Sequence, residues 1–118
     1  MKLNHLDLQV SDVQANVRFL EAAFGLVRET NGTSPAFALL GDGHGFVLVL
    51  QRCAQEEAHY PPDFHVGFVV ATPDEVHEAQ RRIRAAGVEP SDVLENGRGV
   101  MVYCRAPAGF LVEVSCRR

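Results

Sequence analysis

Polar and apolar residues alternate along residues 3–10, and this alternation predicts a β-strand. Successive side chains of a strand point to opposite faces of its sheet, so every second residue shares a face. One face would carry His5, Asp7 and Gln9, and the other would carry Leu6, Leu8 and Val10. We therefore expect a half-buried strand whose apolar face packs on the core.

The spacing of the apolar residues becomes helical directly after this strand. The apolar positions are Val13, Val17, Leu20 and Phe24. They recur every three or four residues, as on one face of a helix. Ser11 or Asp12 can cap this helix, and Gly25 suits its end.

Shorter apolar runs follow at residues 26–29, 35–40 and 46–50, and a glycine-rich turn at 41–45 precedes the last run. These runs predict sequential antiparallel strands. Residues 53–62 are polar and end in two prolines, which can extend neither a helix nor an inner strand. We interpret them as a connector.

The same order of patterns begins again after the connector. Apolar residues alternate with His65 along residues 64–70 and predict a strand, and Thr72–Glu75 has the composition of a helix capping box. The apolar stripe of the second predicted helix is Val76, Ala79, Ile83 and Ala86. Gly87 would end this helix, and strand-like runs follow at 99–104 and 110–116.

The two halves of the chain form an internal repeat. His5 corresponds to His65, and residues 45–49 correspond to residues 109–113. The repeat predicts an α+β fold of two homologous units, since neither half could bury its sheet alone. We expect one domain over residues 1–118, with a first module over about 1–52 and a second over about 63–118.

Composition limits the partners. The chain has 118 residues, 47% of them hydrophobic, and a formal charge of -4 with no Lys/Arg cluster except the terminal pair Arg117 and Arg118. Such a charge distribution would not attract a polyanion, so we expect no nucleic-acid partner. The chain shows no leader pattern and no apolar run of membrane-spanning length, so we expect a cytoplasmic protein without a membrane partner. The three cysteines lack a C-x-x-C pair and are expected to be buried free thiols.

Three polar residues are candidates for chemistry. His5, His65 and Glu113 each lie on the strand face opposite the apolar set, and two imidazoles with one carboxylate form a facial ligand set for a divalent metal. Taken singly, such histidines are more often hydrogen-bonded fillers, and such a glutamate is often solvated. Glu113 favours a metal site over these ordinary roles, because a carboxylate in an apolar strand is costly to bury without a charged partner.

These residues resemble the vicinal oxygen chelate superfamily, which includes glyoxalase I, fosfomycin resistance transferases, extradiol dioxygenases and the antibiotic-sequestering bleomycin resistance proteins. The resemblance covers nearly the whole chain. It is carried by Asn4-His5-Leu6, Phe19–Leu26, Phe64-His65-Val66 and Ala106-Pro107-Ala108-Gly109 ahead of Glu113. The last motif is the most specific, although both aspartates of the family turn are alanine here. We expect the turn to persist, since Pro107 and Gly109 carry its geometry.

The resemblance implies two βαβββ modules that form a cupped mixed sheet, with one helix per module. It also implies a divalent metal held by His5, His65 and Glu113 that acts on a small-molecule substrate. The metal could be Mn, Fe, Ni, Co or Zn, because this ligand set suits all of them. The family usually forms homodimers with shared sites, so His5 could meet the other two ligands across a dimer.

The fourth ligand position of glyoxalase I is occupied by Val49, which cannot bind a metal. The ligand set therefore favours the transferase and dioxygenase members over the isomerase. Three further residues are candidate substrate contacts. Asp7 shares the face of His5, Gln51 shares the face of Val49, and Tyr103 precedes the last hairpin. The alternative is a non-catalytic binding protein of the bleomycin resistance type. The three ligands together favour a metal enzyme, whereas Val49 and the altered turn favour that alternative.

Overall fold

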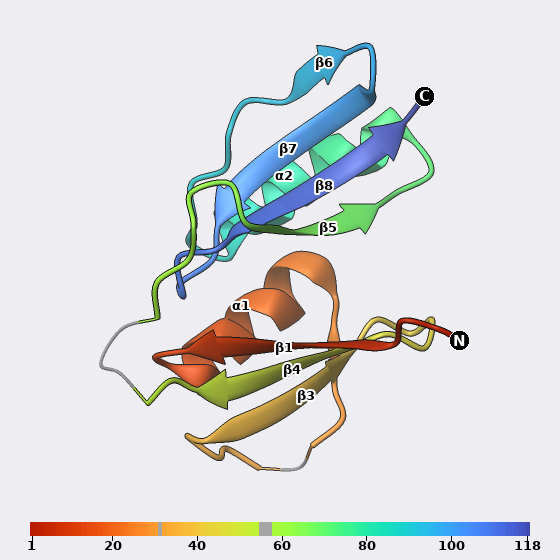
Figure 1. Ribbon diagram of the computed structural model, residues 1–118. Helices are drawn as coiled ribbons and strands as arrows, with labels where there is room; N and C mark the ends of the chain where they lie inside the picture. The colour runs from red at the N-terminus through yellow and green to blue at the C-terminus, as the bar shows by residue number, and fades with distance from the viewer. Residues whose placement is uncertain (31, 55–57) are drawn as a thin grey trace. The chain divides into compact units, whose positions relative to one another are not determined.

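The first module places one helix after its first strand and three further strands after the helix (Figure 1). The computed structural model describes residues 1–30, 32–54 and 58–118. The elements of this module are β1 (His5–Val10), α1 (Val13–Phe24), β2 (Val27–Arg28), β3 (Phe37–Gly41) and β4 (Val47–Arg52). They form a mixed sheet in the order β1-β4-β3-β2, in which only the pair β1 and β4 is parallel.

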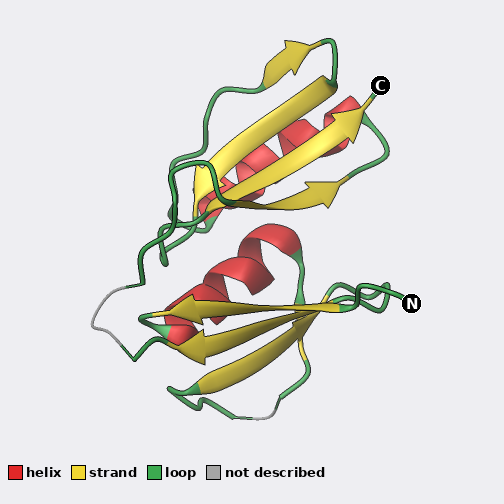
Figure 2. Cartoon of the chain, in the orientation of Figure 1, coloured by secondary structure: helices red, strands yellow, loops and turns green. Residues whose placement is uncertain are grey.

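The second module repeats this arrangement. Its elements are β5 (His65–Val69), α2 (Pro73–Ala85), β6 (Leu94–Asn96), β7 (Gly99–Arg105) and β8 (Leu111–Arg117). The sheet order is β5-β8-β7-β6, again with the first and last strands of the module parallel. The prediction of an α+β fold with two βαβββ modules and one helix in each is thus confirmed (Figure 2).

The chain divides into two compact units, residues 1–59 and 60–118. The boundary lies in the predicted connector 53–62, of which Gln55, Glu56 and Glu57 lie outside the described residues. The interpretation of both units as one domain stays a prediction. In the part of the chain that the structure describes, neither helix is long and apolar enough to cross a membrane.

Each helix covers the apolar face of its own sheet. In the first module Val13, Val17 and Leu20 are buried together with Leu8 and Val10. Leu6 shares the face of Leu8 but is 38% exposed, so the alternation predicted its face and overestimated its burial. In the second module the buried residues on the helix and the adjacent strands are Val76, Ile83, Val102, Val112 and Val114.

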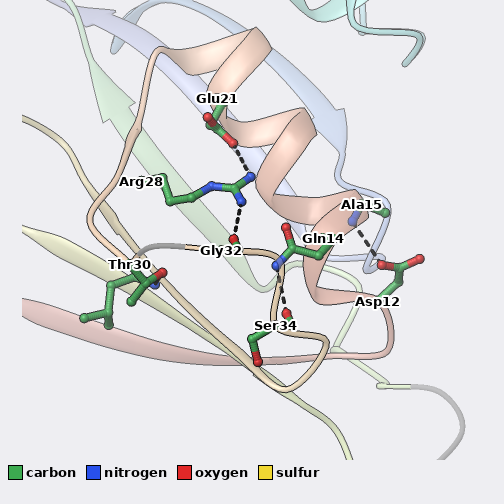
Figure 3. Close-up of polar contacts among 9 residues, drawn as sticks. Asp12, Gln14, Ala15, Glu21, Arg28, Thr30, Gly32 and Ser34 are labelled. Atoms are coloured by element: carbon green, nitrogen blue, oxygen red, sulfur yellow. Dashed lines mark hydrogen bonds and ion pairs between the residues drawn. The ribbon is translucent and has the colours of Figure 1, made fainter.

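Local hydrogen bonds explain where the first helix begins. Asp12 is the N-cap residue, and its carboxylate accepts from the Ala15 amide at 3.0 Å (Figure 3). Of the two predicted caps, Asp12 therefore fills the role. Arg28 joins the segment after the helix to it by donating to Glu21 at 2.9 Å and to the Gly32 carbonyl at 2.8 Å.

The second helix begins with the predicted capping box. The Thr72 hydroxyl accepts from the Glu75 amide, and the Glu75 carboxylate accepts from the Thr72 amide at 2.8 Å. Pro73 is the first helical residue, where a missing amide hydrogen has no cost. The helix is capped at Ala86, and Gly87 follows with a φ of 90°.

Two strands differ from the sequence prediction. The run 26–29 forms only the two-residue strand β2, and no residue pattern located β6, although the resemblance implied a third strand after the second helix. All three residues of β6 are exposed, so the strand lacks the alternation of buried and exposed positions that identifies a strand in a sequence. Its pairing with β7 supplies the third strand after the helix.

Gly99 is the glycine on which the second sheet depends most directly. Its φ is 138°, and a Cβ atom placed there would lie 2.1 Å from the backbone oxygen of Cys116 on β8. Any larger residue would therefore both strain the backbone and push β7 away from β8.

We expect Gly99→Ala to lower the free energy of unfolding by about 2–4 kcal/mol, because backbone strain and overpacking add together. Gly97→Ala is the matched control, since a Cβ there meets no atom within 4 Å. The measurement is chemical denaturation of both variants and the parent protein. Equal stability of the two variants would contradict the close approach of β7 and β8.

Candidate functional site

Two of the predicted ligands lie on the same face of the second sheet. In the parallel pair of β5 and β8, His65 is opposite Leu111 and Gly67 is opposite Glu113. His65 and Glu113 are therefore same-face neighbours, one two-residue step apart along the strands. A Cβ atom at Gly67 would meet nothing within 4 Å, so the surface beside Glu113 is open.

Tyr103 holds the carboxylate of Glu113. These residues are directly opposite in the β7–β8 pair, and the Tyr103 hydroxyl donates to Glu113 Oε2 at 2.6 Å. This bond to the carboxylate, then burial and the negative charge of Glu113, raise the pKa of Tyr103. Tyr103, predicted as a substrate contact, thus orients one oxygen of Glu113. Such partners orient metal-binding carboxylates in known sites.

Both histidines have their Nδ1 atoms engaged by an oxygen. His65 Nδ1 lies 2.9 Å from the carbonyl oxygen of Asp63, which can only accept, so Nδ1 carries the proton. His5 Nδ1 lies 2.8 Å from Asn4 Oδ1, which is an acceptor in this orientation of the amide. When each ring is neutral, Nε2 therefore keeps its lone pair. Both rings are exposed and have the tautomer that binds a metal through Nε2.

The first module carries a second polar group on its corresponding face. Gln51 donates to Asp7 Oδ2, and Gln9 donates to Asp7 Oδ1 at 3.2 Å. Asp7 lies directly opposite Val49 in the parallel pair of β1 and β4. The two substrate contacts predicted for this module, Asp7 and Gln51, are therefore in contact with each other, beside the apolar Val49.

The turn before β8 is closed as predicted, although both aspartates of the family turn are alanine. The Gly109 amide donates to the Ala106 carbonyl at 2.8 Å, and Gly109 has a φ of 95°. The Ala106 amide donates to the Phe110 carbonyl at 3.0 Å. Backbone hydrogen bonds, and a glycine that tolerates positive φ, are thus sufficient to start β8 in the register that places Glu113.

Glu113 also lines a pocket of about 380 Å³ within the second module. The other lining residues are Arg98, Met101, Ser115, Arg117 and Arg118. None of them was singled out for a role by the sequence analysis. Ser115 and Arg117 follow Glu113 at two-residue steps on β8, so strand alternation could have placed them on its face.

His5 belongs to one unit, and His65 and Glu113 belong to the other. Over residues 1–30, 32–54 and 58–118 the structure gathers no group of three His, Cys, Asp or Glu side chains that could hold a metal. The three-ligand set, drawn from both units of one chain or from two chains, therefore stays a prediction.

Comparison with protein families gives one match. Residues 2–114 match the model described as the Glyoxalase/Bleomycin resistance protein/Dioxygenase superfamily. Comparison with curated protein sequences gives no match.

Several solved structures are similar to the chain. A possible glyoxalase from Bacillus cereus is 35% identical, with a TM-score of 0.85 and coverage of 98% of this chain and 99% of that one. A fosfomycin resistance protein from Listeria monocytogenes, solved with Mn(II) and dihydroxypropylphosphonic acid, is 24% identical, with a TM-score of 0.75 and coverage of 97% and 88%. Lactoylglutathione lyase from Agrobacterium tumefaciens is 22% identical, with a TM-score of 0.75 and coverage of 98% and 92%.

The bond between Tyr103 and Glu113 can be tested by titration. In metal-free Tyr60→Phe protein Tyr103 is the remaining tyrosine, and we expect its phenol to ionise above pH 10.0. Adding Glu113→Gln should return the ionisation toward 10.0, because the anionic acceptor is lost. The measurement is the ultraviolet absorbance of the phenolate. Glu95→Gln is the control, since Glu95 pairs with Arg118 instead.

The sign of the linked stability follows from the same shift. The folded protein holds the Tyr103 proton more tightly than the unfolded chain, so stability from this bond is complete below pH 10.0 and is lost as the pH rises through the higher folded-state pKa. Identical ionisation of Tyr103 with Glu113 or Gln at position 113 would contradict the bond.

Proposed function

The chain belongs to the Glyoxalase/Bleomycin resistance protein/Dioxygenase superfamily, and on this premise we propose that it is a metal-dependent enzyme acting on a small molecule. The proposed ligands are His5, His65 and Glu113. The substrate would bind through two oxygen atoms at open positions of a divalent metal, as the name vicinal oxygen chelate implies.

One observation carries this proposal. Both candidate histidines have Nδ1 committed to an oxygen acceptor and Nε2 available, and the candidate carboxylate has one oxygen held by a tyrosine. Histidines that only fill space need no common tautomer, whereas metal ligands need Nε2 unprotonated and a fixed ring orientation. The chemistry of this donor set fits a divalent metal with nitrogen and oxygen ligands.

When bound, such a metal would polarise the oxygens of the substrate and stabilise the negative charge that develops on them. The chain itself would position the reactants. Asp63 and Asn4 would keep the imidazoles in the required tautomer, and Tyr103 would prevent Glu113 from rotating. Asp7, with Gln51 donating to it, would accept a hydrogen bond or a proton from the substrate.

Val49 indicates which reaction types of the superfamily fit this chain. An aliphatic side chain in this position supplies no fourth protein ligand, so a position remains for substrate oxygens or water. We therefore favour transferase or dioxygenase chemistry over glyoxalase isomerisation. The Mn(II) in the Listeria structure makes Mn(II) the first metal to test, followed by Fe, Ni, Co and Zn.

Metal content tests the proposal directly. We expect untagged protein to retain nearly one equivalent of divalent metal per complete site, and the His5→Ala/Glu113→Ala variant to lose it, because one ligand of three cannot hold the ion. Elemental analysis after gel filtration is the measurement. The matched control is His44→Ala/Glu78→Ala, which removes the same residue types from a turn and from the exposed face of α2.

Equal metal content in both variants, or no uptake by the parent protein after reconstitution, would reject the metal enzyme. The non-catalytic binding protein of the bleomycin resistance type would then be the better interpretation.

We also propose a homodimer with shared sites, because the ligands are divided between two units. Light scattering during gel filtration should give about twice the mass of the 12.9 kDa chain. Dimers of His5→Ala and Glu113→Ala chains, once mixed, should regain metal binding in hybrid dimers if the ligands come from both subunits. A monomer at every concentration tested would contradict this proposal.

A further inference from the structure

Positive charge is concentrated at one end of the second sheet, next to Glu113. Arg98 lies in the turn between β6 and β7, and Arg117 and Arg118 end the chain at β8. The Arg118 amide donates to the Arg98 carbonyl at 3.1 Å, which joins the turn to the end of β8. All three arginines line the same pocket, in a chain whose formal charge is -4.

Within residues 1–30, 32–54 and 58–118, two of these arginines lack an acidic partner. Arg118 pairs with Glu95 at 2.5 Å. Among the residues that the structure describes, no ion pair is formed by Arg98 or Arg117. The guanidinium of Arg98 contacts Met101 Sδ at 3.8 Å and also interacts with the Tyr103 hydroxyl, and its remaining donors are available. Two uncompensated guanidinium groups at one pocket favour an anionic ligand.

A nearly buried serine at the same pocket adds a hydroxyl donor to this interpretation. Ser115 is 6% exposed and is one of two buried polar residues in the described chain. It pairs with Met101, lies on the face of Glu113 and lines the pocket. A serine hydroxyl can donate to an anion, so Ser115 adds a neutral donor beside the arginines.

We propose that this pocket binds a terminal oxyanion of the substrate, a carboxylate, phosphonate or phosphate, through Arg98, Arg117 and the Ser115 hydroxyl. The inference rests on the proposed function, since it assigns a substrate class to the same site. Glu113 would stand at the reacting end of the substrate, and the arginines would hold its anionic end.

The strand geometry sets the size of such a substrate. Glu113, Ser115 and Arg117 are successive same-face positions on β8, and each step covers about 7 Å. Long arginine side chains can reach back toward Ser115, so the oxyanion would lie about one such step from Glu113. A small molecule with a few bonds between its coordinating oxygens and its anionic group has this length.

Matched pairs of small probes test the proposal. Acetate and methylphosphonate are the anionic probes, and acetamide and dimethyl methylphosphonate are their uncharged counterparts. Binding is followed by NMR titration of the purified protein, and again after treatment with chelating resin, because a bound metal could itself attract an anion. Either anion should bind, its uncharged counterpart should not, and added salt should weaken binding. The preferred anion identifies the oxyanion.

Variants assign the binding to the named residues. Arg98→Gln/Arg117→Gln should weaken anion binding by about tenfold for each arginine, and Ser115→Ala should weaken it by about fivefold. Arg81→Gln/Arg84→Gln removes the same charge from the exposed face of α2 and should leave binding unchanged. Circular dichroism checks that each variant is folded. Ser115→Ala and the salt dependence remain as tests if the double variant does not fold.

Absence of anion binding by the metal-free protein, or equal weakening by the control variant, would overturn the inference. Because this test needs no metal, its result is separate from that of the metal analysis. Anion binding without metal uptake would support the anion-binding pocket and reject the metal-dependent enzyme. Metal uptake without anion binding would support the enzyme and reject the pocket.

Discussion

The parallel pairing of the first and last strands in each module is the constraint on which the candidate site depends. A parallel pair needs a long crossover, and the helix in each module supplies it and covers one face of the sheet. The other face is left for chemistry. In the second module this pairing sets His65 against Leu111, one step from Glu113. A register shift of one residue would turn Glu113 toward α2, where a carboxylate has no partner.

The repeat distributes its carboxylates unequally. At equivalent paired positions the first module has Asp7 on its first strand opposite Val49, and the second has Gly67 opposite Glu113. Each pair thus retains one acidic residue, but on opposite strands. The equivalents of Tyr103 and Ser115 in the first module are Leu39 and Gln51. The same backbone pairing therefore supports two different sets of side chains: a half-buried pair of tyrosine and carboxylate in the second module, and an exposed group of one carboxylate and two amides in the first.

The features that could be predicted from the sequence are those set by interactions between residues close together in the chain. Strand alternation identified the face of His65 and Glu113, and capping residues located both helices, because these signals need only a few neighbouring residues. The sequence pattern missed β6, whose residues are all exposed and whose existence depends on pairing with β7. It also missed the pocket, because Arg98 reaches β8 only through the turn at Gly99 and the backbone contact with Arg118. The joining of His5 to the other ligands depends on how two units or two chains associate, which no local pattern encodes.

Gly67 has a consequence for how this scaffold can diversify. Position 67 faces away from α2 and has free space around it, so a side chain introduced there would project beside Glu113 without disturbing the core. Mutations that reshape a pocket usually carry a risk to folding, because the same residues also fill the interior. At position 67 a side chain could contact a ligand without taking part in core packing. Selection for new ligands can therefore act on residue 67 with little penalty to stability, which makes it a natural starting point for altered specificity.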